Sequence, residues 1–426
     1  MWRRVCLSST AASTSVVDDI VTFARQASKG EYDQVLDVLK TGIRSKPGSI
    51  GTSRLYLVEA ELRANRGEWD NVVELCRQSA SVASDMSPGS QEESRNRAEV
   101  ELAACRLGTR ALLIGHKDAE AFQTAQQCLD IARKSFSAVG SEDKRWQAMV
   151  LSTSVAGLVQ HASCEFDSAG DSFENVMSLL ESDNGARTAL DHLIPEALKQ
   201  AAAFFAAQGK KERAVSLGMR SIAAAEERLA SNTLDPLLSP RVAEEVVGDA
   251  KVLMAQSCMY RKAWDDAEEK LNDSLSVVES VAEGSGNDQH PYLAMVLLLL
   301  AEVYCRTGRA TLAEGLFREI MKILSVSTAG EGSKGTTAVH PSINSLASWR
   351  YSQLLSVLPK RETEARAWKD LATDIYEEAP LKRLTEPGDM FGSLDRLSGK
   401  GIGGQGVVLD LMTRRALPCT GDSKFA

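Results

Sequence analysis

Five histidines are the residues of this chain best suited to bind a metal ion or to transfer protons near neutral pH. None of them lies in an H-E-x-x-H pattern or at a ligand-like spacing from Cys or Asp. Two of them precede a proline at the expected start of a helix, where capping the helix or shaping a turn is a sufficient role. The sequence therefore predicts no metal site at these histidines, which are His116, His161, His192, His290 and His340.

A glycine-rich segment, Gly401–Gly406, has the spacing G-x-G-x-x-G of a dinucleotide site. Such a site needs a strand before it, a helix after it and an acidic residue about 20 positions further on. Leu394–Ser398 does not have a strand pattern, and only twenty residues follow Gly406. We interpret the segment as a hinge. P-loop and G-x-S-x-G patterns are also missing, so the sequence predicts a non-enzymatic protein with no catalytic residues and no cofactor.

Composition narrows the class of protein further. The chain has 426 residues and a net charge of −9, which does not favour a nucleic-acid surface built from clustered Lys and Arg. Its longest apolar run, Leu293–Ala301, has nine residues, far fewer than the roughly 20 that a membrane-spanning helix needs. The eight cysteines form no C-x-x-C pair, which favours a reducing compartment.

The first 17 residues have the composition of a targeting segment. Met1–Val17 contains Arg3, Arg4 and several Ser and Thr, with no acidic residue before Asp18. This composition is typical of a mitochondrial presequence, although two arginines are few for one. We therefore expect either a mitochondrial targeting segment or a flexible N-terminus, and a cytoplasmic location is the alternative.

The clearest repeat unit along the chain is Leu293–Leu324. Its first helical stretch is rich in Leu, a turn follows at Gly308, and a second helical stretch completes the unit. Ala301 and Ala313 fall where two packed helices would touch, and Phe317 would fill the space between them. This unit predicts a pair of antiparallel helices.

Weaker copies of this helix pair recur along the chain. Their second-helix contact positions are 37 to 53 residues apart, and periods of this size are typical of helical-repeat proteins. Loops rich in Gly, Ser, Asp or Pro separate the copies. The contact positions are Val35, Val72, Ala125, Ala169, Ala214, Ala267, Ala313 and Ala365.

The turns carry a family resemblance. Gly30-Glu31-Tyr32-Asp33 and Gly67-Glu68-Trp69-Asp70 have the form G-x-[YWF]-D, and with the small residues at the helix contacts the chain resembles the tetratricopeptide repeat (TPR) family over Ile20–Glu378. The units that begin at His290-Pro291 and His340-Pro341 are also similar to kinesin light chain repeats. We expect an all-α, right-handed α-solenoid of about seven to eight TPR-like helix pairs over residues 18–379.

The resemblance implies that the first helix of each pair lines a concave surface. Helical register then selects the inward-facing residues, because positions three and four apart share a face. Basic residues are few on this stripe, so the groove should bind an apolar or mixed protein segment rather than a C-terminal carboxylate. The candidate partner-binding residues are Lys199, Gln256, Met259, Tyr260, Glu302, Arg306 and Arg350, and Glu196, Asp249 and His161 lie on the same stripe.

The Pro- and Gly-rich tail, residues 380–426, contains apolar islands at Met390-Phe391 and Val407–Met412. The islands could cap the end of the array, enter the groove or recruit a partner, and we expect capping, since terminal repeats leave an apolar face open. For function, the sequence favours a protein-interaction scaffold in the assembly of a mitochondrial complex. A kinesin light chain-like cargo adaptor in the cytosol is the alternative, and irregular spacing with an acidic charge disfavours an RNA-binding repeat protein.

Overall fold

A computed structural model describes residues 16–378, with gaps at 27–30, 46–47, 88, 140, 182–185, 232–239, 286–289, 329–333 and 337, and residues 406–419. The expected hinge at Gly401–Gly406, apart from Gly406, and the island at Met390-Phe391 lie outside the described residues. So does most of Met1–Val17, whose last two residues begin the first helix. Within the described residues, no helix is long and apolar enough to cross a membrane.

Sixteen α-helices follow one another in the described part of the chain, and consecutive helices pack as eight pairs. This architecture confirms the prediction of an all-α solenoid with that number of helix pairs. The pairs are α1 (Val16–Gln26) with α2 (Tyr32–Ser45), α3 (Ile50–Asn65) with α4 (Trp69–Ser84), α5 (Gln91–Ile114) with α6 (Asp118–Val139), α7 (Glu142–Ala162) with α8 (Phe166–Glu181), α9 (Pro195–Ala207) with α10 (Lys211–Ser231), α11 (Pro240–Tyr260) with α12 (Trp264–Ser285), α13 (Pro291–Arg306) with α14 (Ala310–Ile323), and α15 (Pro341–Val357) with α16 (Glu362–Glu377).

One residue with a positive φ marks the turn inside seven of these pairs. In three pairs it is a glycine, such as Gly308 at φ 75°, which adopts this conformation without a Cβ penalty. A backbone bond from Arg309 N to Tyr304 O at 2.8 Å then caps the preceding helix. The remaining turns use residues other than glycine at φ of 59° to 62°, and these are His116, Cys164, Lys262 and Lys360.

In the seven pairs whose turn is described, the contact position of the second helix lies five residues after the turn residue. Ala169 follows Cys164 at this distance, and Ala313 follows Gly308. In α6 the same rule selects Ala121, one helical turn before the predicted Ala125. Both alanines are buried, since both face the neighbouring helices.

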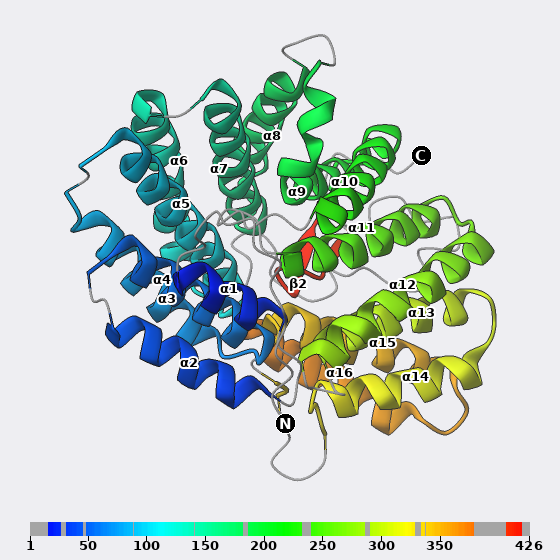
Figure 1. Ribbon diagram of the computed structural model, residues 1–426. Helices are drawn as coiled ribbons and strands as arrows, with labels where there is room; N and C mark the ends of the chain where they lie inside the picture. Colours follow the sequence, from blue (N-terminus) through cyan, green and yellow to red (C-terminus); the bar gives the residue numbers. More distant parts are fainter. Residues whose placement is uncertain are drawn as a thin grey trace.

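The odd-numbered helices form an inner layer, and the even-numbered helices form an outer layer around it (Figure 1). Each odd helix from α1 to α13 packs on the next odd helix. The first helix of each of these pairs therefore lines the inside, as the sequence predicted.

The array curves so far that distant helix pairs meet. Arg106 and Arg110 of α5 form ion pairs with Glu196 of α9 and Glu245 of α11, and Arg110 also donates to the Tyr292 hydroxyl of α13. In Figure 1 the blue N-terminal helices accordingly lie beside the yellow and orange C-terminal ones. The solenoid thus closes around its own axis.

A short β-hairpin lies inside this closed array (Figure 1). Its strands β1 (Val407–Asp410) and β2 (Arg415–Pro418) pair antiparallel, with Val407 opposite Pro418 and Asp410 opposite Arg415. They pack on α7, α9, α11 and α15, all of which are inner helices. The expectation that this part of the tail caps the end of the array was therefore wrong.

Candidate functional site

The concave face of the array holds residues 406–419, which we call the C-terminal hairpin. Its residues from Val408 to Cys419 are all buried. Isolated two-stranded hairpins are at best marginally stable in water, so this one depends on the surrounding helices. Its contacts with the inner helices define what the concave face can bind.

Side chains of α11 hold the main chain of β1. Gln256 makes two bonds to Leu409: its Nε2 donates to the carbonyl oxygen at 3.0 Å, and its Oε1 accepts from the amide at 2.8 Å. The Tyr260 hydroxyl donates to the Val407 carbonyl at 2.7 Å. Both α11 residues were predicted to face the groove, and both recognise backbone atoms that every peptide has.

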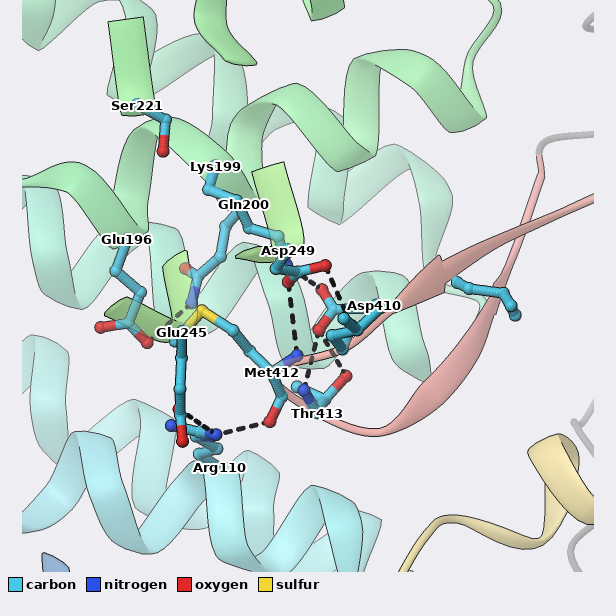
Figure 2. Close-up of polar contacts among 12 residues, drawn as sticks. Arg110, Glu196, Lys199, Gln200, Ser221, Glu245, Asp249, Asp410, Met412 and Thr413 are labelled. Carbon is cyan, nitrogen blue, oxygen red and sulfur yellow. Dashed lines mark hydrogen bonds and ion pairs between the residues drawn. The ribbon is translucent and has the colours of Figure 1, made fainter. Parts of the chain in front are cut away.

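Side chains of α11, α5 and α7 hold the main chain at the turn and at the end of β2. Asp249 of α11 accepts from the amides of Leu411 and Met412 at 3.0 and 3.3 Å, and Arg110 of α5 donates to the Met412 carbonyl at 2.7 Å (Figure 2). His161 of α7 donates from Nε2 to the Pro418 carbonyl at 2.9 Å. Burial lowers the pKa of His161 to about 4, which keeps this imidazole neutral.

A buried ion cluster fixes the end of β1. The Lys199 ammonium lies between the carboxylates of Asp249 and Asp410, and all three side chains are 1% exposed (Figure 2). Burial alone would lower the pKa of Lys199, but the two carboxylates outweigh it and the pKa is raised. Burial raises the pKa of Asp249 to about 6. A small cavity of about 10 Å³, room for at most one water, lies beside Asp410.

The hairpin presents two consecutive arginines to the helix starts on the other side. Arg415 forms a bidentate pair with Asp118 of α6, at 3.0 and 2.7 Å, and its Nη2 lies 2.7 Å from His340 Nε2. Arg414 faces the rings of Trp69 and Tyr292, with its guanidinium carbon 4.6 and 5.1 Å from the two ring centres.

The His-Pro steps cap helices, as the sequence suggested. His290 accepts from the Tyr292 amide and His340 from the Ser342 amide, so each imidazole closes the first turn of its helix. His340, His116 and Asp118 also bring metal-ligand atom types within 4.8 Å of one another. The guanidinium of Arg415 lies between two members of this trio.

The remaining predicted site residues form a separate group beside Tyr260. Glu302 of α13 pairs with Arg306 at 3.6 Å and with Arg350 of α15 at 3.5 Å. Met259 packs half-buried against the apolar core. The structure therefore divides the predicted set: Lys199, Gln256 and Tyr260 hold the hairpin, and the other four lie next to that contact.

Residues of the α5–α6 pair and of the helix starts were missed by the sequence analysis. Arg106 and Arg110 were not placed in register because the repeat around them is weak. Trp69 and Asp118 lie at the starts of second helices, which the inner-stripe rule does not cover. The His-Pro steps at His290 and His340 and the turn motif that contains Trp69 were the sequence features that pointed to this region.

Comparisons with known proteins found similarity to solved structures only. No family model matches the chain, and no curated protein matches it either. Among solved structures it is similar to BtubC (BKLC) from P. vanneervenii, at 15% identity over 60% of this chain and 90% of that one, with a TM-score of 0.42. It is also similar to the apo form of RapI, at 9% identity over 76% of each chain and a TM-score of 0.43. The Rap conjugation gene regulator of plasmid pLS20, in complex with the Phr* peptide, is 12% identical over 76% of this chain and 75% of its own, with a TM-score of 0.39. By its own architecture the chain is an all-α protein of repeated helix pairs.

Proposed function

We propose that this protein is a non-enzymatic interaction scaffold whose concave face binds an extended segment of a partner protein. The C-terminal hairpin is the resident occupant of that face, and the partner segment takes its place. The hairpin is therefore an internal competitor, and its own binding free energy sets the affinity that a partner segment needs in order to displace it.

The observation that carries this proposal is the recognition of main-chain atoms. Gln256, Asp249, Tyr260 and Arg110 all bond to backbone amides or carbonyls of the hairpin. Side chains that bond to backbone recognise an extended segment largely independently of its sequence. The same contacts can therefore serve a segment from another chain.

The test uses the full-length chain with Asp410→Lys and a fluorescent peptide of residues 406–419 under reducing conditions. The substitution places a second ammonium beside Lys199, so the resident hairpin is weakened while every helix residue stays unchanged. We expect the variant to bind the peptide at least tenfold more tightly than the wild-type chain does, measured by fluorescence anisotropy.

Asp37→Lys is the matched control. Asp37 is exposed on α2, and its replacement by lysine changes the charge by the same amount as Asp410→Lys. It should bind the peptide as weakly as the wild type. Failure of the Asp410→Lys chain to bind the peptide, with helicity retained by circular dichroism, would show that the hairpin is a permanent part of the fold.

For the place of action we propose mitochondria, with assembly or stabilisation of a larger complex as the role. The composition of Met1–Val17 supports this proposal. A fusion of Met1–Val17 to a fluorescent protein should enter mitochondria. A purely cytosolic signal would favour the alternative, a cargo adaptor similar to kinesin light chains.

A further inference from the structure

We infer that the helix starts around Arg414 and Arg415 form a receptor for two consecutive arginines, which a partner segment supplies when it replaces the hairpin. The inference rests on the proposed function and adds the chemistry of the ligand: an extended segment that carries an Arg-Arg pair at a tight turn. We call the residues that contact the two guanidinium groups the arginine-pair site.

The first half of the arginine-pair site is built for a flat cation. The guanidinium of Arg414 faces Trp69 and Tyr292 at 4.6 and 5.1 Å, and its Nη1 donates to the Ala338 carbonyl at 3.0 Å. The side chain is 2% exposed. A guanidinium stacks on aromatic faces and sheds water more readily than an ammonium does, so arginine suits this position better than lysine.

The second half is built for a forked donor. Both terminal nitrogens of Arg415 reach the two carboxylate oxygens of Asp118, at 3.0 and 2.7 Å. This parallel geometry needs a guanidinium, because an ammonium cannot form it. Burial and the nearby Arg415 hold the pKa of His340 well below its ordinary value, so the imidazole beside the cation stays neutral.

Each half joins residues from distant parts of the chain. Trp69 and Asp118 begin α4 and α6, whereas Tyr292 and His340 lie at the starts of α13 and α15. One Arg-Arg pair therefore bridges the N-terminal and C-terminal thirds of the array where the solenoid closes. A ligand with both arginines makes the contacts with the aromatic rings and with Asp118, whereas a ligand without arginines makes neither.

The experiment titrates the full-length Asp410→Lys chain with four fluorescent peptides of residues 406–419. They are the natural sequence, Arg414→Lys with Arg415→Lys, Arg414→Ala with Arg415→Ala, and an isomer with both arginines moved to the N-terminus. We expect the lysine peptide to bind at least tenfold more weakly than the natural one, and the alanine peptide and the isomer at least a hundredfold more weakly. Equal affinity for the arginine and lysine peptides, or for the natural peptide and the isomer, would overturn the inference.

A receptor-side cycle tests the geometry. In the Asp410→Lys background, Asp118→Asn should reduce the cost of Arg415→Ala in the peptide at least fivefold, while leaving the cost of Arg414→Ala unchanged. Trp69→Leu should instead reduce the cost of Arg414→Ala at least fivefold and leave the cost of Arg415→Ala unchanged. Costs that stay the same in both receptors would contradict the assignment of each arginine to its half of the site.

The outcomes separate this inference from the proposed function. If no peptide binds, the proposed function fails; if all four bind equally, only the arginine-pair site fails. Displacement of the natural peptide by one equivalent of Zn²⁺ would instead make His116, Asp118 and His340 a metal site and overturn the assignment of Arg415.

If the Asp410→Lys chain does not fold, the peptide titration is replaced by a measurement of amide hydrogen exchange in the hairpin. Replacing Arg414 and Arg415 by lysine in the otherwise wild-type chain should then speed exchange at Leu409 and Leu411 at least tenfold. Unchanged exchange would overturn the inference.

Discussion

The two sides of the C-terminal hairpin are held by different chemistry. On the side of β1 and the residues just after it, Gln256 and Asp249 bond to the main chain, and Lys199 pairs with a single side chain, Asp410. On the side of β2, the guanidinium groups of Arg414 and Arg415 enter sites built from aromatic rings and a carboxylate. The first side recognises that a segment is extended, and the second recognises which segment it is.

This difference separates stability from selectivity. Main-chain contacts and a fully buried ion cluster are costly to break, because each leaves polar groups unpaired away from water. The arginine contacts depend on the shape of one side chain, so conservative changes there should alter the choice of ligand more than the stability. The predictions that follow test this division, from the largest expected effect to the smallest.

Lys199→Met should have the largest effect. It leaves Asp249 and Asp410 facing each other without a cation, and removing one partner of a buried ion pair costs about 3–5 kcal/mol. Denaturant unfolding and amide exchange at Leu411 and Met412 would both report the loss.

Lys210→Met is the matched control for Lys199→Met. Its ammonium lies 3.3 Å from Glu174 with both side chains 48% exposed, so the loss should stay below about 1 kcal/mol. Similar losses in the two variants would mean that the cluster contributes no more than a surface pair.

Gln256→Met should come next. The substitution keeps the volume but leaves the amide and carbonyl of Leu409 unpaired in a buried place, which costs about 2–3 kcal/mol in total. Amide exchange at Leu409 should accelerate more than exchange in α16. Retained protection at Leu409 would show that the main-chain contacts do not hold β1.

Helix pairs were predictable from the sequence because each contact is local. The turn residue, the small position five residues later and the inner stripe with Lys199 and Gln256 all follow from one helical period.

The occupant of the groove was not predictable in the same way. Gln256 and Leu409 are 153 residues apart, and no periodicity connects them. The hairpin turn also lacks the glycine that usually marks such a turn in a sequence. Arg414 takes the left-handed conformation there instead, at φ 50°. Such a short hairpin folds only against a surface, so its strands leave a weak pattern in the sequence.

Acidification should weaken the hairpin contact at His161. The pKa of this buried imidazole is about 4 in the folded chain against 6.5 when exposed, so the unfolded state binds more protons between these values. Stability is complete above pH 6.5 and falls as the pH drops towards 4, by about 2 kcal/mol at pH 5. The charged groups around it are Asp410, Arg415 and Lys199.

His161→Gln isolates this contribution, because the glutamine amide can donate to the Pro418 carbonyl and does not titrate. The variant should lose about 2 kcal/mol less than the wild type between pH 7 and pH 5. Identical pH profiles would place the titration elsewhere, with His340 as the next group to replace, since its pKa is also lowered by burial.

Arg415→Lys should have the smallest effect on stability and still change selectivity. The ammonium keeps its charge beside Asp118 but gives up one arm of the bidentate pair, so the free energy of unfolding should fall by only about 1 kcal/mol. The same change in the free peptide should weaken its binding severalfold. A loss as large as that of Lys199→Met would mean that both sides of the hairpin carry the fold, and the division between a sequence-tolerant side and a selective side would not hold.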